Sequence, residues 1–168
     1  MKTAPLFAAL LLLAAAFAPA QNEPKGFVGK KAPAFSFTSL EGTKLSNAKL
    51  KGKVVILDFW ASWCGNCLKA SPTMQKLSDT YASKGLVVVG VNAKETKVRP
   101  AASLKYKRDH ATKYALVSDG DAAHANYKVP GLPVIVVIDR QGFVKAIFND
   151  FVTETTPAQL EAAVKAAL

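Results

Sequence analysis

The chain contains few cysteines and histidines, the residues that form disulfides and bind metal ions in small domains. It has only two cysteines and two histidines among its 168 residues. Two cysteines can form only one disulfide, which excludes a small scaffold held together by several disulfides. A zinc site on the two cysteines would need two more ligands, and only His110 and His124 remain. Both cysteines lie in one segment, "DFWASWCGNC", at residues 58–67.

The first twenty residues have the order of a secretory signal. Lys2 is followed by an apolar stretch at residues 4–18 and then by "APAQ", so we expect cleavage after Ala20. The apolar stretch contains Pro5 and is shorter than the ~20 residues that cross a bilayer, which argues against an uncleaved anchor. No cysteine follows Ala20 directly, so no lipid-attachment site is present there. The sequence predicts a signal peptide at 1–20 and a periplasmic or otherwise extracytoplasmic protein.

The chain is basic, with a formal net charge of +10, and loss of Lys2 with the signal leaves 10 − 1 = +9. Such a charge raises the question of a nucleic acid or a membrane surface as partner. The chain has no nucleic-acid motif, and we expect no nucleic-acid partner. Positive residues concentrate from Lys94 to Lys113. A solvated helix face explains them, and a patch that steers acidic protein partners is the alternative.

The mature chain reads as one domain. Residues 21–31 are polar, with Pro and Gly, and predict a flexible lead-in to a domain at 32–168. The alternating segment "AFSFTSLEGTKLS" predicts a hairpin on the edge of a sheet, turning at Glu41-Gly42. The apolar run "KVVILDFW" predicts a strand buried on both faces, with Phe59 and Trp60 in the core.

The next segments predict a β-α-β unit. The pattern turns helical from Cys64 to about Lys84, with a kink expected at Pro72 and a stop at Gly85. The run "LVVVGVN" at 86–92 predicts a second buried strand, parallel to the first.

The rest of the chain completes an α/β fold, a central mixed β-sheet with helices on both faces and an N-terminal hairpin. Thr156 is the expected cap of the last helix, with Pro157 in its first turn. The other expected elements are a helix at 100–114, a short strand at 115–119, helical turns at 122–127 and a strand hairpin at 133–148.

The position of the two cysteines predicts redox chemistry. Cys64 lies at the amino end of a helix, where unpaired N–H groups and the helix dipole stabilise a thiolate. Cys67 lies about one turn further on, so the two sulfurs can form a disulfide with little backbone movement. Cys64 is then the nucleophile that attacks a partner's disulfide, and Cys67 resolves the mixed disulfide. A purely structural bridge is disfavoured, because so short a loop removes little chain entropy.

The segment "DFWASWCGNC" resembles the active-site segment of thioredoxins. Residues 29–168 resemble the secreted TlpA/ResA-type branch of that superfamily, through "GKKAPAFSFTSLEG", "KGKVVILDFWASWC" and "VPGLPVIVVIDRQG". The resemblance implies a thioredoxin-like fold with a central α/β insertion between Leu86 and Val129. It also implies a protein-disulfide oxidoreductase without cofactor or metal, with disulfide-containing protein substrates and a membrane thiol-reductant carrier as electron donor. We expect a monomer.

The resemblance also assigns roles to residues outside the cysteine pair. Pro133 matches the family's cis proline, which faces the cysteines, and the backbone of Leu132 before it would pair with the substrate chain. Asp58 matches the buried acid that passes protons to and from the resolving sulfur. A carboxylate in an apolar strand has a raised pKa, which suits that role. The alternative for Asp58 is an acid that hydrogen-bonds to backbone at the strand end.

Three residues around the cysteines are expected to shape the active site. Trp63 is expected on the exposed contact surface. Gly65-Asn66 stands where thioredoxins have Gly-Pro, and the side-chain amide of Asn66 is a candidate donor to a sulfur. Ala70 replaces an acid that many relatives carry, and Val134 replaces the usual Thr. The departures at Ala70 and Val134 argue against assignment to a particular pathway, such as cytochrome c maturation.

Two other functions remain open on the same fold. A peroxiredoxin-like peroxidase shares the "APAF" opening, but Leu57 and Ala61 stand at the Pro and Thr positions of the peroxidase pattern P-x-x-x-T-x-x-C. A metal or haem chaperone would use both sulfurs with a histidine. His124 is the only candidate near Pro133, and a lone histidine there is more often a surface residue. Reduction of protein disulfides is the expected direction.

Overall fold

A computed structural model describes residues 26–168, and the expected signal peptide lies outside them. The central sheet contains β3 (Val54–Trp60), β4 (Leu86–Asn92), β5 (Ala115–Val117), β6 (Val134–Ile138) and β7 (Val144–Phe148). A small second sheet contains β1 (Ser36–Thr38) and β2 (Lys44–Ser46). The helices are α1 (Gly65–Tyr81), α2 (Arg99–Asp109), α3 (Asp121–Asn126) and α4 (Thr156–Ala167), with a 3₁₀ turn, η1, at Ala82–Lys84.

The central sheet is mixed, with the strand order β5-β4-β3-β6-β7. Its middle strand, β3, runs parallel to β4 and antiparallel to β6. Every residue of β3 is buried, as its continuous apolar run predicts, because both faces of a central strand are covered. The carboxyl end of β3 leads directly into α1. Gly85, with φ +94°, ends the helical segment after η1, at the expected stop.

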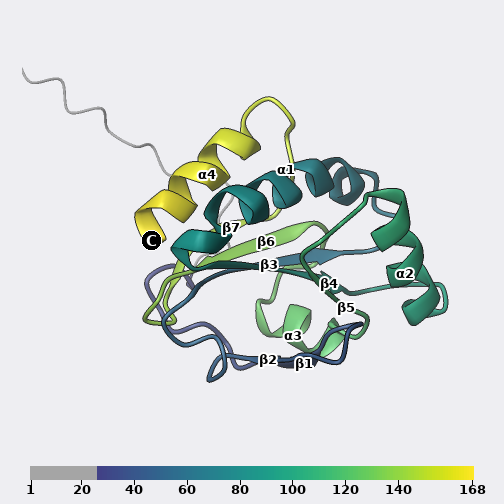
Figure 1. The fold of residues 1–168 in the computed structure, drawn as a ribbon, viewed down its shortest axis with the longest axis horizontal. Coiled ribbons are helices and arrows are strands. Elements are labelled where there is room, and N and C mark those ends of the chain that lie inside the picture. The colour runs from purple at the N-terminus through teal and green to yellow at the C-terminus, as the bar shows by residue number, and fades with distance from the viewer. Residues whose placement is uncertain (1–25) are drawn as a thin grey trace, which may run out of the picture.

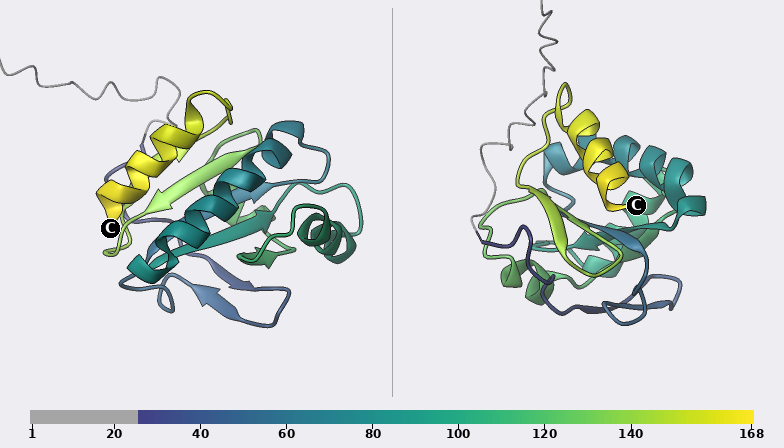
Figure 2. Two further views of the ribbon diagram at one scale, coloured as in Figure 1. Left: turned by 45° about the horizontal axis from the view of Figure 1, so that its top comes forward. Right: turned by 90° about the vertical axis from the view of Figure 1, so that its left-hand side faces the viewer.

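Helices cover both faces of this sheet (Figures 1 and 2). α1 and α4 lie side by side over one face, and Met74 and Leu160 join its core cluster. α3 and the β1-β2 hairpin lie over the other face, where Phe37, Leu45 and Tyr127 belong to a second cluster. The predicted α/β class with two covered faces is confirmed. No helix within residues 26–168 has the length and apolar character needed to span a membrane.

Three sequence predictions need correction. The β1-β2 hairpin forms its own sheet instead of extending the central one, because Phe37 and Leu45 point onto the sheet face as the single buried residue of each strand. α2 ends at Asp109 and not near residue 114, since Ala111 has a positive φ that leaves the helix. Thr156 is the first residue of α4 and not its cap, and its Oγ1 accepts a hydrogen bond from the N–H of Val152 at 2.9 Å.

The described part of the expected lead-in is hydrogen-bonded to the domain. The N–H of Gly29 donates to the carbonyl of Val144 at 2.8 Å, and Val144 donates back to Lys30 at 2.9 Å. Ala32 likewise donates to Gly142 at 2.9 Å. Residues 29–32 therefore run antiparallel to residues 142–144, at the start of β7, while the boundary at residue 32 stays a prediction.

Candidate active site

The two cysteines lie where β3 passes into α1. Cys64 is the N-cap of α1, with extended backbone, and its Sγ accepts a hydrogen bond from the N–H of Cys67 at 3.2 Å. The two residues form a disulfide with their Cα atoms 5.3 Å apart. Cys64 keeps 6% of its surface exposed and Cys67 keeps none. Gly65 beside them is exposed, with no atom within 4 Å of where a Cβ would lie. An approaching thiol or disulfide can therefore reach the pair only at Cys64.

Asp58 is fully buried in β3, behind this junction. Neither carboxylate oxygen has a hydrogen-bond partner among the described residues, so the alternative of a backbone-bonded acid is wrong. Burial raises the pKa of Asp58 to about 7, which confirms the expected direction. The hydroxyls of Tyr106 and Tyr114 are also buried and lie 3.2 Å apart. Burial, followed by the charge of Asp58, raises the pKa of Tyr106, so this tyrosine stays neutral.

The loop before β6 carries the only cis peptide bond within residues 26–168, between Leu132 and Pro133. Val134 then pairs with Phe59 near the end of β3, which brings the loop to the same edge of the sheet as the cysteines. Leu132 packs against the core cluster that contains Cys64 and Cys67. The expected cis proline is confirmed.

His124 holds the same loop. It is 5% exposed and not a surface residue as expected, because α3 packs its ring against the edge of Phe59, with centroids 5.5 Å apart. Its Nε2 lies 3.0 Å from the carbonyl oxygen of Gly131. Burial lowers the pKa of His124, so the ring is neutral and donates to that carbonyl. Lys94 adds a second contact to the loop, from its Nζ to the carbonyl of Pro130 at 2.5 Å.

The residues that flank the cysteines differ in exposure. Trp63 is 51% exposed and donates from Nε1 to the carbonyl of Lys94 at 2.9 Å, whereas Phe59 and Trp60 are fully buried. These three exposures agree with expectation. The Asn66 amide does not bond to a sulfur. It donates to Asp150 Oδ1 at 3.1 Å in the loop between β7 and α4.

Sequence reasoning missed Glu95, which organises the loop that precedes Cys64. Its carboxylate accepts from the N–H and Oγ of Ser62 at 2.9 and 3.0 Å and from Asn92 Nδ2 at 3.1 Å. It also accepts from the N–H groups of Thr96 and Lys97. Burial alone would raise the pKa of Glu95, but these hydrogen bonds lower it to about 2. Glu95 could have been found from its position just after β4, because neighbouring parallel strands end at the same edge of a sheet and β3 ends just before the cysteines.

The basic stretch from Lys94 to Lys113 is partly neutralised. Lys107 pairs with Glu41, and Lys105 pairs with Asp109. Arg99 pairs with Asp121 and lies 3.8 Å from Asp119. Within residues 26–168, no three His, Cys, Asp or Glu side chains gather as metal ligands.

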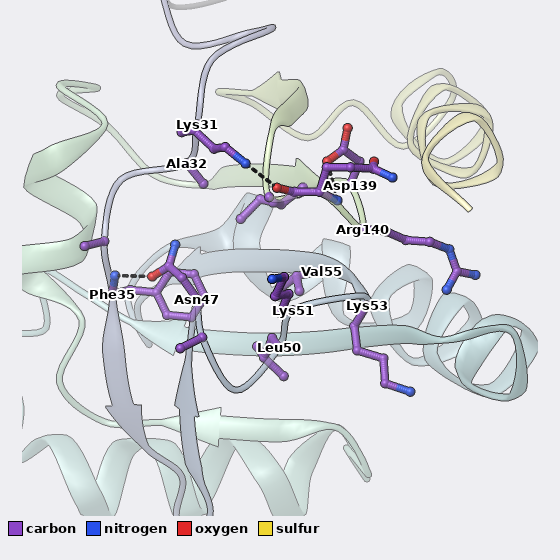
Figure 3. Close-up of a pocket in the computed structure, with 15 residues that line it drawn as sticks. Lys31, Ala32, Phe35, Asn47, Leu50, Lys51, Lys53, Val55, Asp139 and Arg140 are labelled. Atoms are coloured by element: carbon purple, nitrogen blue, oxygen red, sulfur yellow. Dashed lines mark hydrogen bonds between the residues drawn. The ribbon is translucent and has the colours of Figure 1, made fainter.

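A pocket of about 450 Å³, shown in Figure 3, lies near the start of β3. The cysteines follow the opposite end of this strand. Its wall contains Phe35, Leu50 and Val55, the last near the start of β3. Its polar side chains mostly bond to the protein itself. Asn47 Oδ1 accepts from the N–H of Phe35 at 2.7 Å, and Arg140 donates to three backbone carbonyls.

Comparison with known proteins agrees with this geometry. The Redoxin family profile matches residues 27–164. The chain is 34% identical over 145 residues to the thiol-disulfide oxidoreductase ResA of Bacillus thuringiensis (strain Al Hakam), covering 86% of this chain and 80% of that protein. It is 34% identical over 125 residues to the thiol:disulfide interchange protein DsbE of Pseudomonas fluorescens biotype C, covering 73% and 66%.

Solved structures show the same relationship. The crystal structure of a putative thiol:disulfide interchange protein DsbE from Chlorobium tepidum superposes with a TM-score of 0.74 at 31% identity, covering 82% of this chain and 94% of that one. This chain carries a C-x-x-C disulfide at the start of α1, beside the middle strand of a mixed sheet. The chain therefore belongs to the Redoxin family and is a thiol-disulfide oxidoreductase of the thioredoxin superfamily.

Proposed function

We propose that the protein reduces disulfides of exported proteins, with Cys64 as nucleophile and Cys67 as resolving cysteine. One observation carries this assignment. The two sulfurs differ in access, because Cys64 is 6% exposed at the cap of α1 and Cys67 is fully buried one turn behind it. A substrate can therefore be captured at the first sulfur and released by the second.

The reaction begins with the dithiol form of the pair. The N–H of Cys67, which lies 3.2 Å from the Cys64 sulfur, donates to the Cys64 thiolate, and the amino end of α1 adds its dipole. This thiolate attacks one sulfur of the substrate disulfide. The S–S bond breaks, a mixed disulfide forms at Cys64, and the first substrate thiolate leaves and takes a proton from solvent.

Release requires Cys67 to lose its proton. Asp58 accepts that proton in our proposal, since its pKa of about 7 lets it gain and lose a proton near neutrality. The Cys67 thiolate then attacks the Cys64 sulfur, which closes the Cys64–Cys67 disulfide and expels the second substrate thiolate. Two electrons have passed from the pair to the substrate, and the pair is oxidised.

The substrate chain would lie across the surface around Cys64. The backbone of Leu132, held before Pro133, is the proposed edge for pairing with an extended substrate segment. Exposed Trp63 and Gly65 and half-buried Asn66 form the rest of the contact surface. The contact of His124 with Gly131 supports this assignment, because it holds the loop next to the end of β3.

The cellular setting follows from the amino-terminal sequence. We infer a cleaved signal at residues 1–20, a lead-in at 21–31 and a domain at 32–168 that acts in the periplasm or another extracytoplasmic compartment. An oxidised pair needs two electrons and two protons for the next cycle. A membrane thiol-reductant carrier is the proposed donor, and a monomer is the proposed working form.

Two cysteine variants test the mechanism on the purified mature domain with insulin as substrate and dithiothreitol as reductant. Cys64→Ser is expected to lose all catalysis of insulin reduction. In a separate reaction without dithiothreitol, which would itself cleave the product, reduced Cys67→Ser is expected to accumulate a mixed disulfide between Cys64 and an insulin chain, visible by non-reducing mass spectrometry. Accumulation in Cys64→Ser and not in Cys67→Ser would reverse the two roles. Equal, undiminished turnover in both variants would refute the proposed function.

A further inference from the structure

A small pocket lies beside the disulfide and has no part in the mechanism above. Its volume is about 160 Å³. Ser62 and Leu68 contribute to its wall from the cysteine segment, two residues before and four residues after Cys64. The N–H of Leu68 donates to the carbonyl of Cys64 at 3.2 Å, so this part of the wall is the first turn of α1. The opposite wall comes from α2.

The floor of this pocket is apolar and rigid. Trp60 and Tyr106 are both buried and stack with ring centroids 3.9 Å apart. Leu68 and Ala102 complete the apolar lining. Stacked aromatic rings held by a sheet and a helix keep their shape when a ligand arrives, so the pocket is preformed.

The rim is positively charged. Two lysines, Lys97 and Lys105, line it together with a single acid, Asp109, and with the imidazole of His110. Asp109 is paired with Lys105. Lys97 has no salt-bridge partner among residues 26–168 and is exposed. The unpaired charge at the rim, that of Lys97, is therefore positive. It favours a ligand that carries an acidic group next to the part bound on the pocket floor.

The volume of the pocket limits the size of the group that it can bind. A cavity of about 150 Å³ is known to hold a benzene ring, whereas pockets for free small molecules start at about 300 Å³. The pocket thus suits one large apolar side chain. The segments that border it also expose apolar surface, with Trp63 at 51%, Val98 at 75% and Leu104 at 46%. Such exposure next to a reactive centre is typical of a protein contact surface.

We propose that this pocket is a specificity subsite, which takes an aromatic or large aliphatic side chain of the substrate close to the cysteine that Cys64 attacks. An acidic substrate residue next to that side chain pairs with Lys97. The inference rests on the proposed function, since it names the substrate class of the same thiol exchange. The preferred substrates are therefore acidic segments with an apolar residue beside a disulfide.

A peptide series tests the subsite. Each peptide carries one cysteine blocked as a mixed disulfide with 2-nitro-5-thiobenzoate, in a Gly/Ser background. A single Phe moves through the positions that flank the cysteine, and its neighbour is Glu or Lys. Release of the coloured thiol by the reduced protein gives kcat/KM, and the peptide without Phe reports the intrinsic reactivity of Cys64.

The matched variants are Ala102→Leu, which fills the pocket, and Ala101→Leu, which adds the same side chain at the exposed neighbouring position of α2. One Phe position is expected to raise kcat/KM about tenfold or more in the wild type and in Ala101→Leu. That gain is expected to disappear in Ala102→Leu, while its rate with the peptide without Phe equals that of Ala101→Leu. An equal Phe gain in both variants, or no gain in the wild type, would overturn the subsite.

Lys97→Glu keeps the test decisive if Ala102→Leu fails to fold. Its side chain is exposed, and the variant is expected to reverse the preference from Glu to Lys beside the Phe. A preference for Glu that persists in this variant would contradict the charged rim. Absence of reaction with every peptide, including the peptide without Phe, would instead refute the proposed function, and the two failures are therefore distinguishable.

Discussion

Replacement of Asp58 by asparagine should make the stability of the protein less dependent on pH. The wild-type carboxyl is fully buried without a hydrogen-bond partner among the described residues, and its pKa rises from 3.8 to about 7 on folding. Between these two values the unfolded chain loses the proton and the folded chain keeps it. The contribution of Asp58 to stability is therefore highest below pH 3.8, falls as the pH rises towards about 7, and is constant above that.

The size of this loss follows from the two pKa values. Each pKa unit corresponds to about 1.4 kcal/mol, so the interval from 3.8 to about 7 corresponds to about 4 kcal/mol. The substituted asparagine side chain does not ionise and escapes this cost. Because its buried amide also lacks hydrogen-bond partners, the free energy of unfolding of the variant is lowered by an amount that does not change with pH. The pH dependence of the difference between the two proteins is therefore the quantity that tests the argument.

Urea unfolding of both proteins in the disulfide form measures this difference. Oxidation removes the cysteines from the titration, and other ionisable groups such as His124 and Glu95 contribute equally to both proteins. The variant should gain about 4 kcal/mol relative to the wild type between about pH 4 and about pH 8. A difference that stays flat across this range would show that Asp58 ionises like an exposed acid, and the reasoning about its role would fail.

Further predictions concern the rate and the two loops beside the cysteines. Asp58→Asn should slow release of the mixed disulfide by about 10²-fold in rapid-quench assays, because proton transfer contributes at least that much; an unchanged rate would remove Asp58 from the mechanism. Glu95→Gln should destabilise the protein by about 1–3 kcal/mol in urea unfolding, because the N–H groups around Ser62 lose an ionised acceptor; unchanged stability would refute this. His124→Phe should raise KM for insulin more than it lowers kcat, since the carbonyl of Gly131 loses its donor. The contribution of His124 to stability should fall below about pH 6.5, where the unfolded His124 gains a proton, so the variant should gain stability relative to the wild type as the pH falls through this range.

Local sequence patterns were enough to predict most of the fold. The run "KVVILDFW" has the length and continuity of a strand covered on both faces, and it became β3. Gly85 marked the end of the helical segment, because φ +94° suits glycine. The redox pair was equally clear, since C-x-x-C after a buried strand places the first sulfur at a helix cap.

Contacts between distant residues could not be predicted in this way. Asn66 donates to Asp150, which is 84 residues away in sequence, and no local pattern distinguishes that acceptor from a nearby sulfur. His124 is buried because α3 places it against Phe59 and Gly131. The hairpin of β1 and β2 has the correct alternation, but alternation alone does not say whether it joins a sheet edge or covers a sheet face.

The reduction potential of the Cys64–Cys67 pair tests the central claim most directly. The mature domain is equilibrated with defined ratios of reduced and oxidised glutathione or dithiothreitol, quenched in acid, alkylated and weighed by mass spectrometry. We predict one two-electron transition at a reducing potential, nearer to about −270 mV than to the about −120 mV of a strong dithiol oxidant. A midpoint near about −120 mV would reverse the direction of electron flow. A pair that shows no transition over the accessible range would contradict its assignment as the reactive centre.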